Sequence, residues 1–143
     1  MQHKILIVDD EPEICEILEF NLASEDFQVI VAYSAEEAEN HLDDSFSLIL
    51  LDVMLGGISG YKFAEKIRKQ GKTVPIIFLT AKSGENEMLT GFSVGGDDYI
   101  TKPFSIKEVV ARVKAVIKRT PKSAVMEFLP KLDFPGLSID TTL

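Results

Sequence analysis

The chain has 143 residues, 45% of them hydrophobic, and a formal net charge of −8. This length and composition suit one compact domain with a tail and exclude a disordered chain, and no apolar run approaches the roughly 20 residues that cross a bilayer. The single cysteine, Cys15, excludes an internal disulfide. A single cysteine, together with the absence of a signal-peptide pattern at the start, favours a reducing, cytoplasmic setting without a membrane partner.

Charge is divided unevenly along the chain. Residues 1–52 hold fourteen acidic residues and one basic residue, whereas residues 53–143 hold nine acidic and fourteen basic residues. The acidic first half disfavours direct binding of nucleic acid by this part of the chain, and it would attract divalent cations.

Five short apolar runs alternate with helical patterns. The runs predict strands at Ile5–Val8, Phe27–Val31, Leu48–Leu51, Ile76–Leu79 and Tyr99–Ile100. The patterns predict helices at Glu11–Ala23, at Ser34–Leu42, around Phe63 and Ile67 as far as Gly71, at Glu85–Val94 and at Ser105–Ile117. Strict alternation of strands and helices predicts an α/β fold with a parallel sheet covered on both faces. We expect a flavodoxin-like (βα)5 three-layer sandwich with strand order 2-1-3-4-5.

Polar residues follow four of these strands. Asp9 and Asp10 follow the first strand, and Asp52 ends the third. Thr80 follows the fourth strand, and Lys102 comes shortly after the fifth. Because parallel strands end at one edge of a sheet, and the switch point of this strand order lies between strands one and three, we expect these side chains to meet in one crevice.

Three carboxylates in one crevice repel one another unless a cation lies among them. Mg²⁺ suits such a group, because it prefers oxygen ligands and keeps several waters. A carboxylate placed there could attack phosphorus and form an aspartyl phosphate, whose charge needs positive partners such as Lys102 and donors such as Thr80. Taken alone, the acidic run Asp9–Glu11 is more typical of a helix N-terminus, Thr80 of a strand-end cap and Lys102 of a solvated turn. Their joint placement favours a site.

Four motifs resemble the receiver domain of two-component response regulators. They are Ile5–Glu11 (ILIVDDE), Leu51–Leu55 (LDVML), Leu79–Lys82 (LTAK) and Gly96–Phe104 (GDDYITKPF). They occur in order, with suitable spacing, within residues 4–119. The resemblance is specific for that reason.

The later part of the chain resembles the OmpR-type subclass of this family, in which a winged-helix DNA-binding domain follows the linker. The resemblance is carried by Glu108–Val113 in the last predicted helix and by Phe134–Asp140. We therefore expect a receiver domain at residues 1–119. Residues 120–143 would be a linker and the start of a winged-helix domain that this chain does not contain.

The resemblance implies a signalling switch rather than an enzyme, with self-catalysed phosphotransfer and autodephosphorylation at one aspartate. Asp52 would accept a phosphoryl group from a sensor histidine kinase in a reaction that depends on Mg²⁺ or Mn²⁺. Asp10 would bind the metal directly and Asp9 through water, and Asp52 and the backbone carbonyl of Met54 would complete the ligands. Lys102 would pair with the phosphoryl group.

The resemblance also implies a conformational readout. Thr80 and Tyr99 would form the switch pair, and the peptide between Lys102 and Pro103 would be cis. The face made by helix four, strand five and helix five would form a two-fold homodimer on phosphorylation. DNA would be bound only through the absent C-terminal domain.

Some positions depart from the family pattern. Gly56 stands where proline is usual in the loop after the phosphoacceptor, and Gly96 replaces a common alanine. The expected dimer face contains Asp98, Arg112, Glu108 and Met88. Met88 occupies a position where a basic residue often pairs across the dimer with the acid that corresponds to Glu108, which leaves Asp98 and Arg112 as candidates for another pair.

Two other functions remain open on the sequence. A phosphohydrolase with an aspartyl nucleophile would use a similar site, but it needs a second acid two residues after the nucleophile, where this chain has Met54. A flavin-binding module can use the same fold. It would need an aromatic-flanked phosphate loop, and the acids Asp9–Glu11 would repel a phosphate.

Overall fold

The computed structural model describes residues 2–56, 58–81, 90 and 93–119. Five parallel strands form one sheet in the order β2-β1-β3-β6-β7. Because β6 and β7 are the predicted fourth and fifth strands, this order confirms the flavodoxin-like arrangement. The strands span Lys4–Val8 (β1), Gln28–Ala32 (β2), Leu48–Asp52 (β3), Ile76–Thr80 (β6) and Asp98–Thr101 (β7).

Four helices complete the described fold, and a small hairpin follows β3. The helices are Pro12–Ser24 (α1), Ala35–His41 (α2), Gly60–Lys69 (α3) and Ile106–Arg119 (α5). The antiparallel hairpin consists of Met54–Leu55 (β4) and Ile58–Ser59 (β5). The helix predicted at Glu85–Val94 lies mostly outside the described residues, and the predicted linker at residues 120–143 lies wholly outside them.

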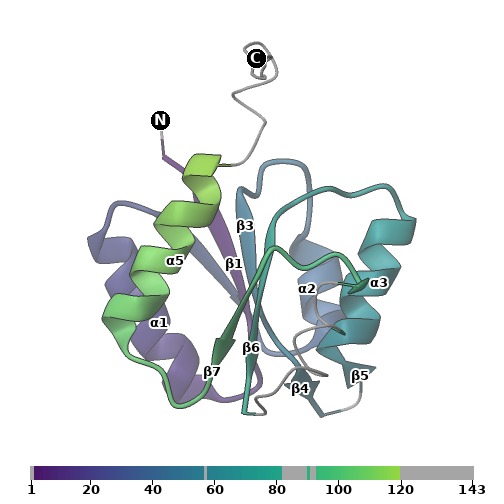
Figure 1. Cartoon of the computed structure of the whole chain (residues 1–143), viewed down its shortest axis with the longest axis horizontal. Helices are drawn as coiled ribbons and strands as arrows, with labels where there is room; N and C mark the ends of the chain where they lie inside the picture. Colours follow the sequence, from purple (N-terminus) through teal and green to yellow (C-terminus); the bar gives the residue numbers. More distant parts are fainter. Residues whose placement is uncertain (1, 57, 82–89, 91–92, 120–143) are drawn as a thin grey trace.

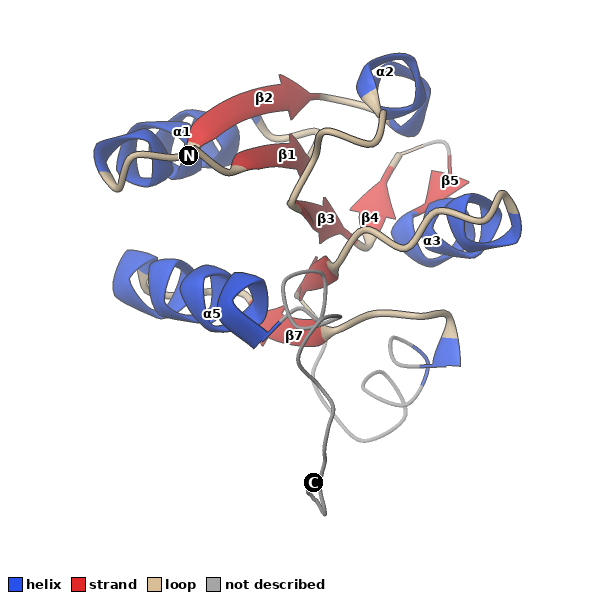
Figure 2. Cartoon of the chain, turned by 90° about the horizontal axis from the view of Figure 1, so that it is seen from above, coloured by secondary structure: helices blue, strands red, loops and turns tan. Residues whose placement is uncertain are grey.

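Helices cover both faces of the sheet, as Figures 1 and 2 show. Helices α1 and α5 lie on one face, and α2 and α3 lie on the other. Side chains along each strand alternate between the two faces because the strand repeat is two residues. In β1, Ile5 and Ile7 pack with α1 and α5, whereas Leu6 and Val8 pack with α2 and α3. All five residues of β3 and of β6 are buried, which explains why the first four residues of each strand are apolar.

Local capping determines where several helices begin. The Ser34 side chain accepts a hydrogen bond from the backbone N–H of Glu37 at 3.1 Å, so the predicted capping box is present. Ser105 accepts from the N–H of Glu108 at 3.0 Å in the same way. Pro12 lies in the first turn of α1, where its missing N–H costs no helical hydrogen bond.

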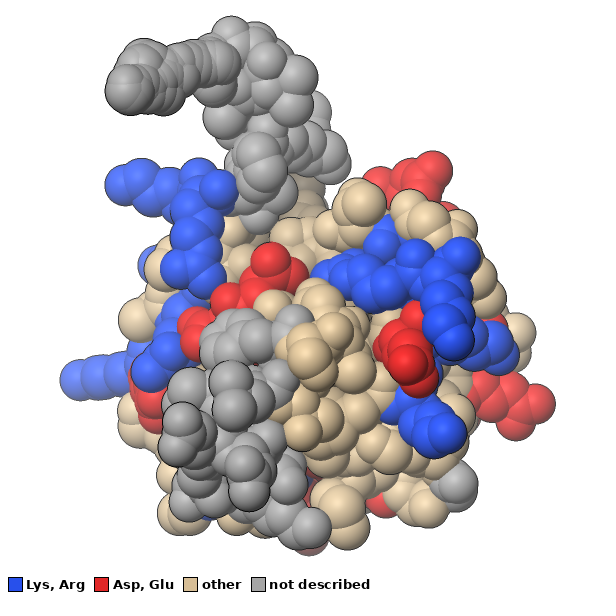
Figure 3. Space-filling model, turned by 45° about the vertical axis from the view of Figure 1, so that its right-hand side comes forward, with Lys and Arg blue, Asp and Glu red and all other residues tan. Residues whose placement is uncertain are grey.

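On the face in Figure 3, Lys and Arg side chains gather in separate groups with acidic side chains beside them and uncharged atoms between. Among the described residues, no helix is both long and apolar enough to span a membrane.

Candidate functional site

The carboxyl ends of β1, β3, β6 and β7 lie together because all four strands run parallel in register. Val8 pairs with Leu51, and Thr80 pairs with Thr101. The backbone N–H of Lys102 donates to the carbonyl of Thr80 at 2.7 Å, which extends the β6–β7 pairing past the end of β7. This register brings the residues that follow each strand to one edge of the sheet.

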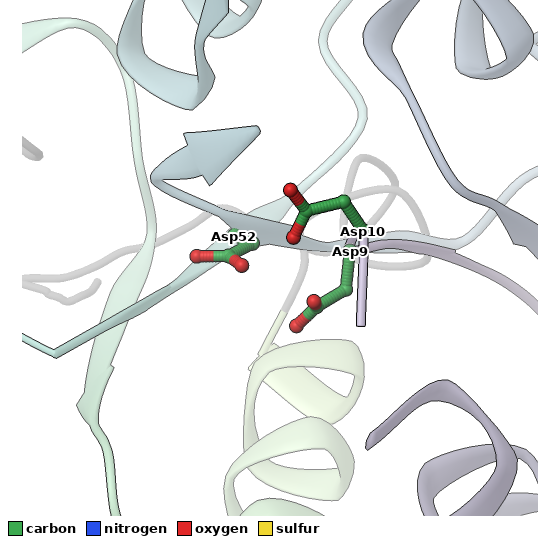
Figure 4. Close-up of side chains that lie close together, drawn as sticks. All are labelled: Asp9, Asp10 and Asp52. Atoms are coloured by element: carbon green, nitrogen blue, oxygen red, sulfur yellow. The ribbon is translucent and has the colours of Figure 1, made fainter. Parts of the chain in front are cut away.

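Asp9, Asp10 and Asp52 converge at this edge, as Figure 4 shows. Each offers a carboxylate oxygen that lies within 4.8 Å of those of the other two. Asp9 and Asp52 are buried, with 0% and 3% of their surface exposed, whereas Asp10 is exposed. The predicted acidic cluster is therefore present, with two carboxylates inside the protein and one at the surface.

Lys102 supplies the positive charge within the cluster. Its Nζ lies 3.2 Å from Oδ2 of Asp52 and 3.3 Å from Oδ2 of Asp9. The same nitrogen lies 3.3 Å from Oε1 of Glu11. Burial lowers the pKa of Lys102, but the charges of Asp9 and Asp52 outweigh it, so the pKa of Lys102 lies above its ordinary value. The ammonium therefore stays charged at neutral pH. The peptide bond between Lys102 and Pro103 is cis, as expected.

Burial makes the Asp9 carboxylate hard to ionise. The pKa of Asp9 is raised from 3.8 to about 6. Loss of water is the largest cause and the charge of Asp52 adds to it, whereas the backbone N–H of Glu11 and the ammonium of Lys102 act in the opposite direction. The N–H of Glu11 donates to Oδ1 of Asp9 at 2.9 Å. One cation does not balance these acids, so the site is electrostatically strained and suited to a second, divalent cation.

The Asp52 carboxylate is held in one orientation. Its Oδ1 accepts a hydrogen bond from the backbone N–H of Met54 at 3.0 Å, while Oδ2 faces Lys102. Met54 itself is 61% exposed. A carboxylate fixed at both oxygens can present only a limited set of directions to a reacting atom.

The start of α3 packs directly against the backbone of Asp52. A Cβ atom at Gly60 would lie 2.2 Å from the Asp52 carbonyl oxygen, so only glycine fits. The N–H of Gly60 also donates to the carbonyl of Val53 at 2.7 Å. The sequence pattern assigns no role to Gly60, because this close approach depends on where α3 returns to the sheet.

The hairpin after β3 explains one departure from the family pattern. Gly56 has φ of +75°, in the left-handed region that glycine enters without strain. Proline, the usual residue there, has φ fixed near −65° and could not adopt this turn. A Cβ at Gly56 would lie 3.7 Å from Oδ2 of Asp10, so the turn lies beside the acidic cluster.

The predicted switch residues lie on neighbouring strands. Thr80 is fully buried at the end of β6. Tyr99 is half-buried in β7, pairs in register with Phe78 and packs against the core on the α2 and α3 face. Thr80 thus lies at the edge of the sheet where the site is, and Tyr99 lies on the neighbouring strand, two residues before Thr101, the partner of Thr80.

Three of the four residues expected at a dimer face are described, and they contact one another within the chain. Nη1 of Arg112 lies 3.0 Å from Oδ1 of Asp98, and its Nε lies 3.2 Å from Oε2 of Glu108. The fourth residue, Met88, lies outside the described residues. The Asp98–Arg112 pair is therefore intramolecular here, and its expected role between subunits stays a prediction.

A family model for the response regulator receiver domain matches residues 5–114 of this chain. The phosphate regulon transcriptional regulatory protein PhoB of Escherichia coli strain K12 is 42% identical over 145 residues, covering 99% of this chain and 62% of that protein. The chain thus spans about three fifths of the length of that relative.

Solved structures agree with these relatives. The non-phosphorylated HemR receiver domain from Leptospira biflexa superposes with a TM-score of 0.79 at 38% identity and covers 83% of this chain and 97% of that one. The response regulator DrrB, described as a Thermotoga maritima OmpR/PhoB homologue, superposes with a TM-score of 0.76 at 34% identity. That match covers 83% of this chain and 54% of DrrB. The family model and the solved structures agree with the expected receiver domain, and the similarity to PhoB and DrrB agrees with the expected OmpR-type subclass.

Proposed function

This chain belongs to the family of response regulator receiver domains, and on that premise we propose that it is a phosphorylation-dependent switch with Asp52 as the phosphoacceptor. The observation that carries the proposal is the placement of the Asp52 carboxylate, buried beside Asp9 and Asp10 and 3.2 Å from the Lys102 ammonium. The phosphohydrolase alternative gains no support, because the position two residues after Asp52 holds the exposed Met54.

In the proposed reaction, a carboxylate oxygen of Asp52 attacks the phosphorus of a phosphohistidine on a sensor kinase. The new O–P bond forms as the P–N bond breaks, and the electron pair of that bond stays on the imidazole nitrogen, which takes up a proton. The N–H of Met54 holds Asp52 in orientation, and Lys102 can donate to an oxygen of the arriving phosphoryl group. In autodephosphorylation, water attacks phosphorus, the O–P bond to Asp52 breaks, and inorganic phosphate leaves while the carboxylate is regenerated.

The donor set at the site fits a hard divalent cation. We propose that Asp10 and Asp52 bind Mg²⁺ or Mn²⁺ directly, Asp9 through water, with the backbone carbonyl of Met54 as a further ligand. The three carboxylates lie within 4.8 Å of one another, are all oxygen donors and include one that is exposed for entry from solvent. When bound, such an ion supplies positive charge that stabilises the phosphoryl oxygens in the transition state.

We further propose that Thr80 and Tyr99 read the phosphorylated state. Thr80 would donate its hydroxyl to a phosphoryl oxygen, and the ring of Tyr99 would move inward. Phosphorylation adds a charge of roughly −1.5 to −2 at the edge of the sheet, which is enough to bias a bistable surface. The proposed readout surface is the face formed by the predicted fourth helix, β7 and α5.

The proposed output is a two-fold homodimer through this face and, in a longer protein, control of DNA binding. Asp98, Glu108 and Arg112 lie on β7 and α5, where such a dimer would form. PhoB, which is longer than this chain, is a transcriptional regulatory protein. We therefore propose that residues 1–119 are the receiver domain and that residues 120–143 lead into a winged-helix domain. An unchanged monomer mass by light scattering at high concentration, with a phosphoryl mimic present, would contradict the dimer.

Mass spectrometry of phosphodonor-treated protein tests the central proposal. With Mg²⁺ and acetyl phosphate, the chain should gain one phosphoryl group that maps to Asp52. Asp52→Asn should abolish this gain. Asp44→Asn, which changes an exposed acid outside the site, should leave it intact. Equal labelling of Asp52→Asn and the unaltered chain would show that another residue is phosphorylated.

A further inference from the structure

Glu11 directs its side chain into the site instead of capping the helix that it precedes. It occupies the N-cap position of α1, where a side chain commonly accepts a hydrogen bond from the first helical turn, but it forms no such bond. Its Oε1 lies 3.3 Å from Nζ of Lys102, a residue 91 positions away. The contact is therefore tertiary and is not a consequence of helix formation.

With Glu11, every donor of the Lys102 ammonium has a carboxylate partner. An ammonium carries three N–H groups, and Nζ of Lys102 lies within 3.3 Å of oxygens of Asp9, Asp52 and Glu11. The first two carboxylates are buried, whereas the Glu11 side chain is 54% exposed. The ammonium thus lies between a buried acidic pair and one acid on the solvent side.

We propose that Glu11 is a positioning residue that restrains Lys102 and competes with an incoming phosphoryl group for its ammonium. This inference rests on the proposed function. Lys102 can donate to a phosphoryl oxygen only by releasing one of its three partners, and an exposed ion pair is the weakest of them. Glu11 also holds a negative charge beside the position where an anionic phosphoryl group arrives.

This arrangement makes the unphosphorylated site slower to react than its other residues would allow. Breaking the contact should free an N–H of Lys102 for the donor and increase the rate of phosphorylation. Exposed ion pairs typically change an equilibrium by no more than about fivefold, so the expected acceleration is about two- to fivefold.

Two substitutions at Glu11 separate the contact from the charge. Glu11→Gln removes the charge. Glu11→Asp keeps the charge on a side chain that is one methylene shorter, which should no longer reach Nζ of Lys102. The matched control is Glu13→Gln, because Glu13 is exposed in the first turn of α1 and forms no ion pair within the described part of the chain.

The experiment measures the initial rate of Asp52 labelling by acetyl phosphate with Mg²⁺, in the full 143-residue chain. Glu11→Gln and Glu11→Asp should both react about two- to fivefold faster than the unaltered chain, and Glu13→Gln should react at the unaltered rate. In donor-free protein, the NMR signals of the Lys102 methylene next to the ammonium should shift in both Glu11 variants and not in Glu13→Gln.

Several results would overturn the inference. If Glu11→Asp reacts at the unaltered rate while Glu11→Gln is faster, charge alone acts and the contact with Lys102 does not matter. A Mg²⁺ dissociation constant that changes in parallel with the rate would show that Glu11 acts through the metal. If the unaltered chain is labelled at Asp52 and both Glu11 variants are labelled at the same rate as it, the role of Glu11 is wrong but the proposed function stands. Absence of labelling in the unaltered chain removes the proposed function and this inference with it.

Discussion

Replacing Asp9 with asparagine should stabilise the metal-free protein at neutral pH, although Asp9 belongs to the proposed site. Asp9 is fully buried, and burial, together with the charge of Asp52, raises its pKa from 3.8 to about 6. At pH 7.5 the folded protein therefore keeps a charge in surroundings that disfavour it. Asparagine removes this charge and keeps an oxygen that can accept the N–H of Glu11, now 2.9 Å from the Asp9 carboxylate.

The pKa shift of Asp9 gives the size of the effect. A rise from 3.8 to about 6 is about 2 pKa units, and each unit corresponds to about 1.36 kcal/mol, so the upper limit is about 3 kcal/mol. That shift already includes the favourable contact of Lys102 with Oδ2 of Asp9. Asparagine that keeps its oxygen toward Glu11 places its NH2 group beside the Lys102 ammonium, and this pair of facing donors offsets the gain by about 1–2 kcal/mol. The expected net stabilisation is therefore about 1–2 kcal/mol.

The stabilisation should depend on pH with a definite sign. The folded pKa of Asp9 is raised, so its contribution to stability is fully present below its ordinary pKa of 3.8 and is lost as the pH rises through about 6. The advantage of the asparagine variant should therefore be larger at pH 7.5 than at pH 4 by about 2 kcal/mol.

Urea unfolding in the presence of a metal chelator, followed by circular dichroism at pH 4 and pH 7.5, measures both effects. Asp44→Asn is the control, because Asp44 is exposed and its replacement should change the unfolding free energy little. If Asp9→Asn is less stable than the unaltered chain at pH 7.5, or if its advantage is equal at the two pH values, the electrostatic account of the site is wrong.

Three further predictions concern packing, thiol reactivity and metal binding. Gly60→Ala should lower the unfolding free energy by at least about 2 kcal/mol, because its Cβ would lie 2.2 Å from the Asp52 carbonyl oxygen. Gly71→Ala is the control, because Gly71 has φ of +86° and an added Cβ would have no atom within 4 Å, so it should lower the unfolding free energy by only about 1 kcal/mol. Equal losses for the two variants in thermal unfolding would contradict the packing argument. Cys15 should resist iodoacetamide at pH 8 in the native protein and react in urea, because it is 1% exposed and its pKa is raised to about 12, chiefly by burial. Rapid alkylation of the native protein would refute this. Mg²⁺ at about 100 times its dissociation constant should raise the unfolding free energy by about 2.7 kcal/mol, and Asp10→Asn should largely remove that gain in urea titrations.

The sequence alone was sufficient to predict the sheet, its strand order and the edge at which the site lies. Apolar runs such as Leu48–Leu51 predict strands buried on both faces, and their alternation with helices leaves few topologies for a parallel sheet. Once the strands are parallel, the residues that follow them must meet at one edge. The cluster of Asp9, Asp10, Asp52 and Lys102 therefore follows from strand ends and not from any long-range detail.

Tertiary structure alone decided the distances and charges within that edge. The contact between Glu11 and Lys102 joins residues that are distant in sequence, and the need for glycine at position 60 arises only where α3 returns to the sheet. The pairing of Arg112 with Asp98 inside one chain likewise depends on how α5 lies against β7. Sequence periodicity specifies which face a residue occupies, because strand and helix repeats are local. The pKa of Asp9 depends on burial and on charges brought in by other strands, so only the folded arrangement determines it.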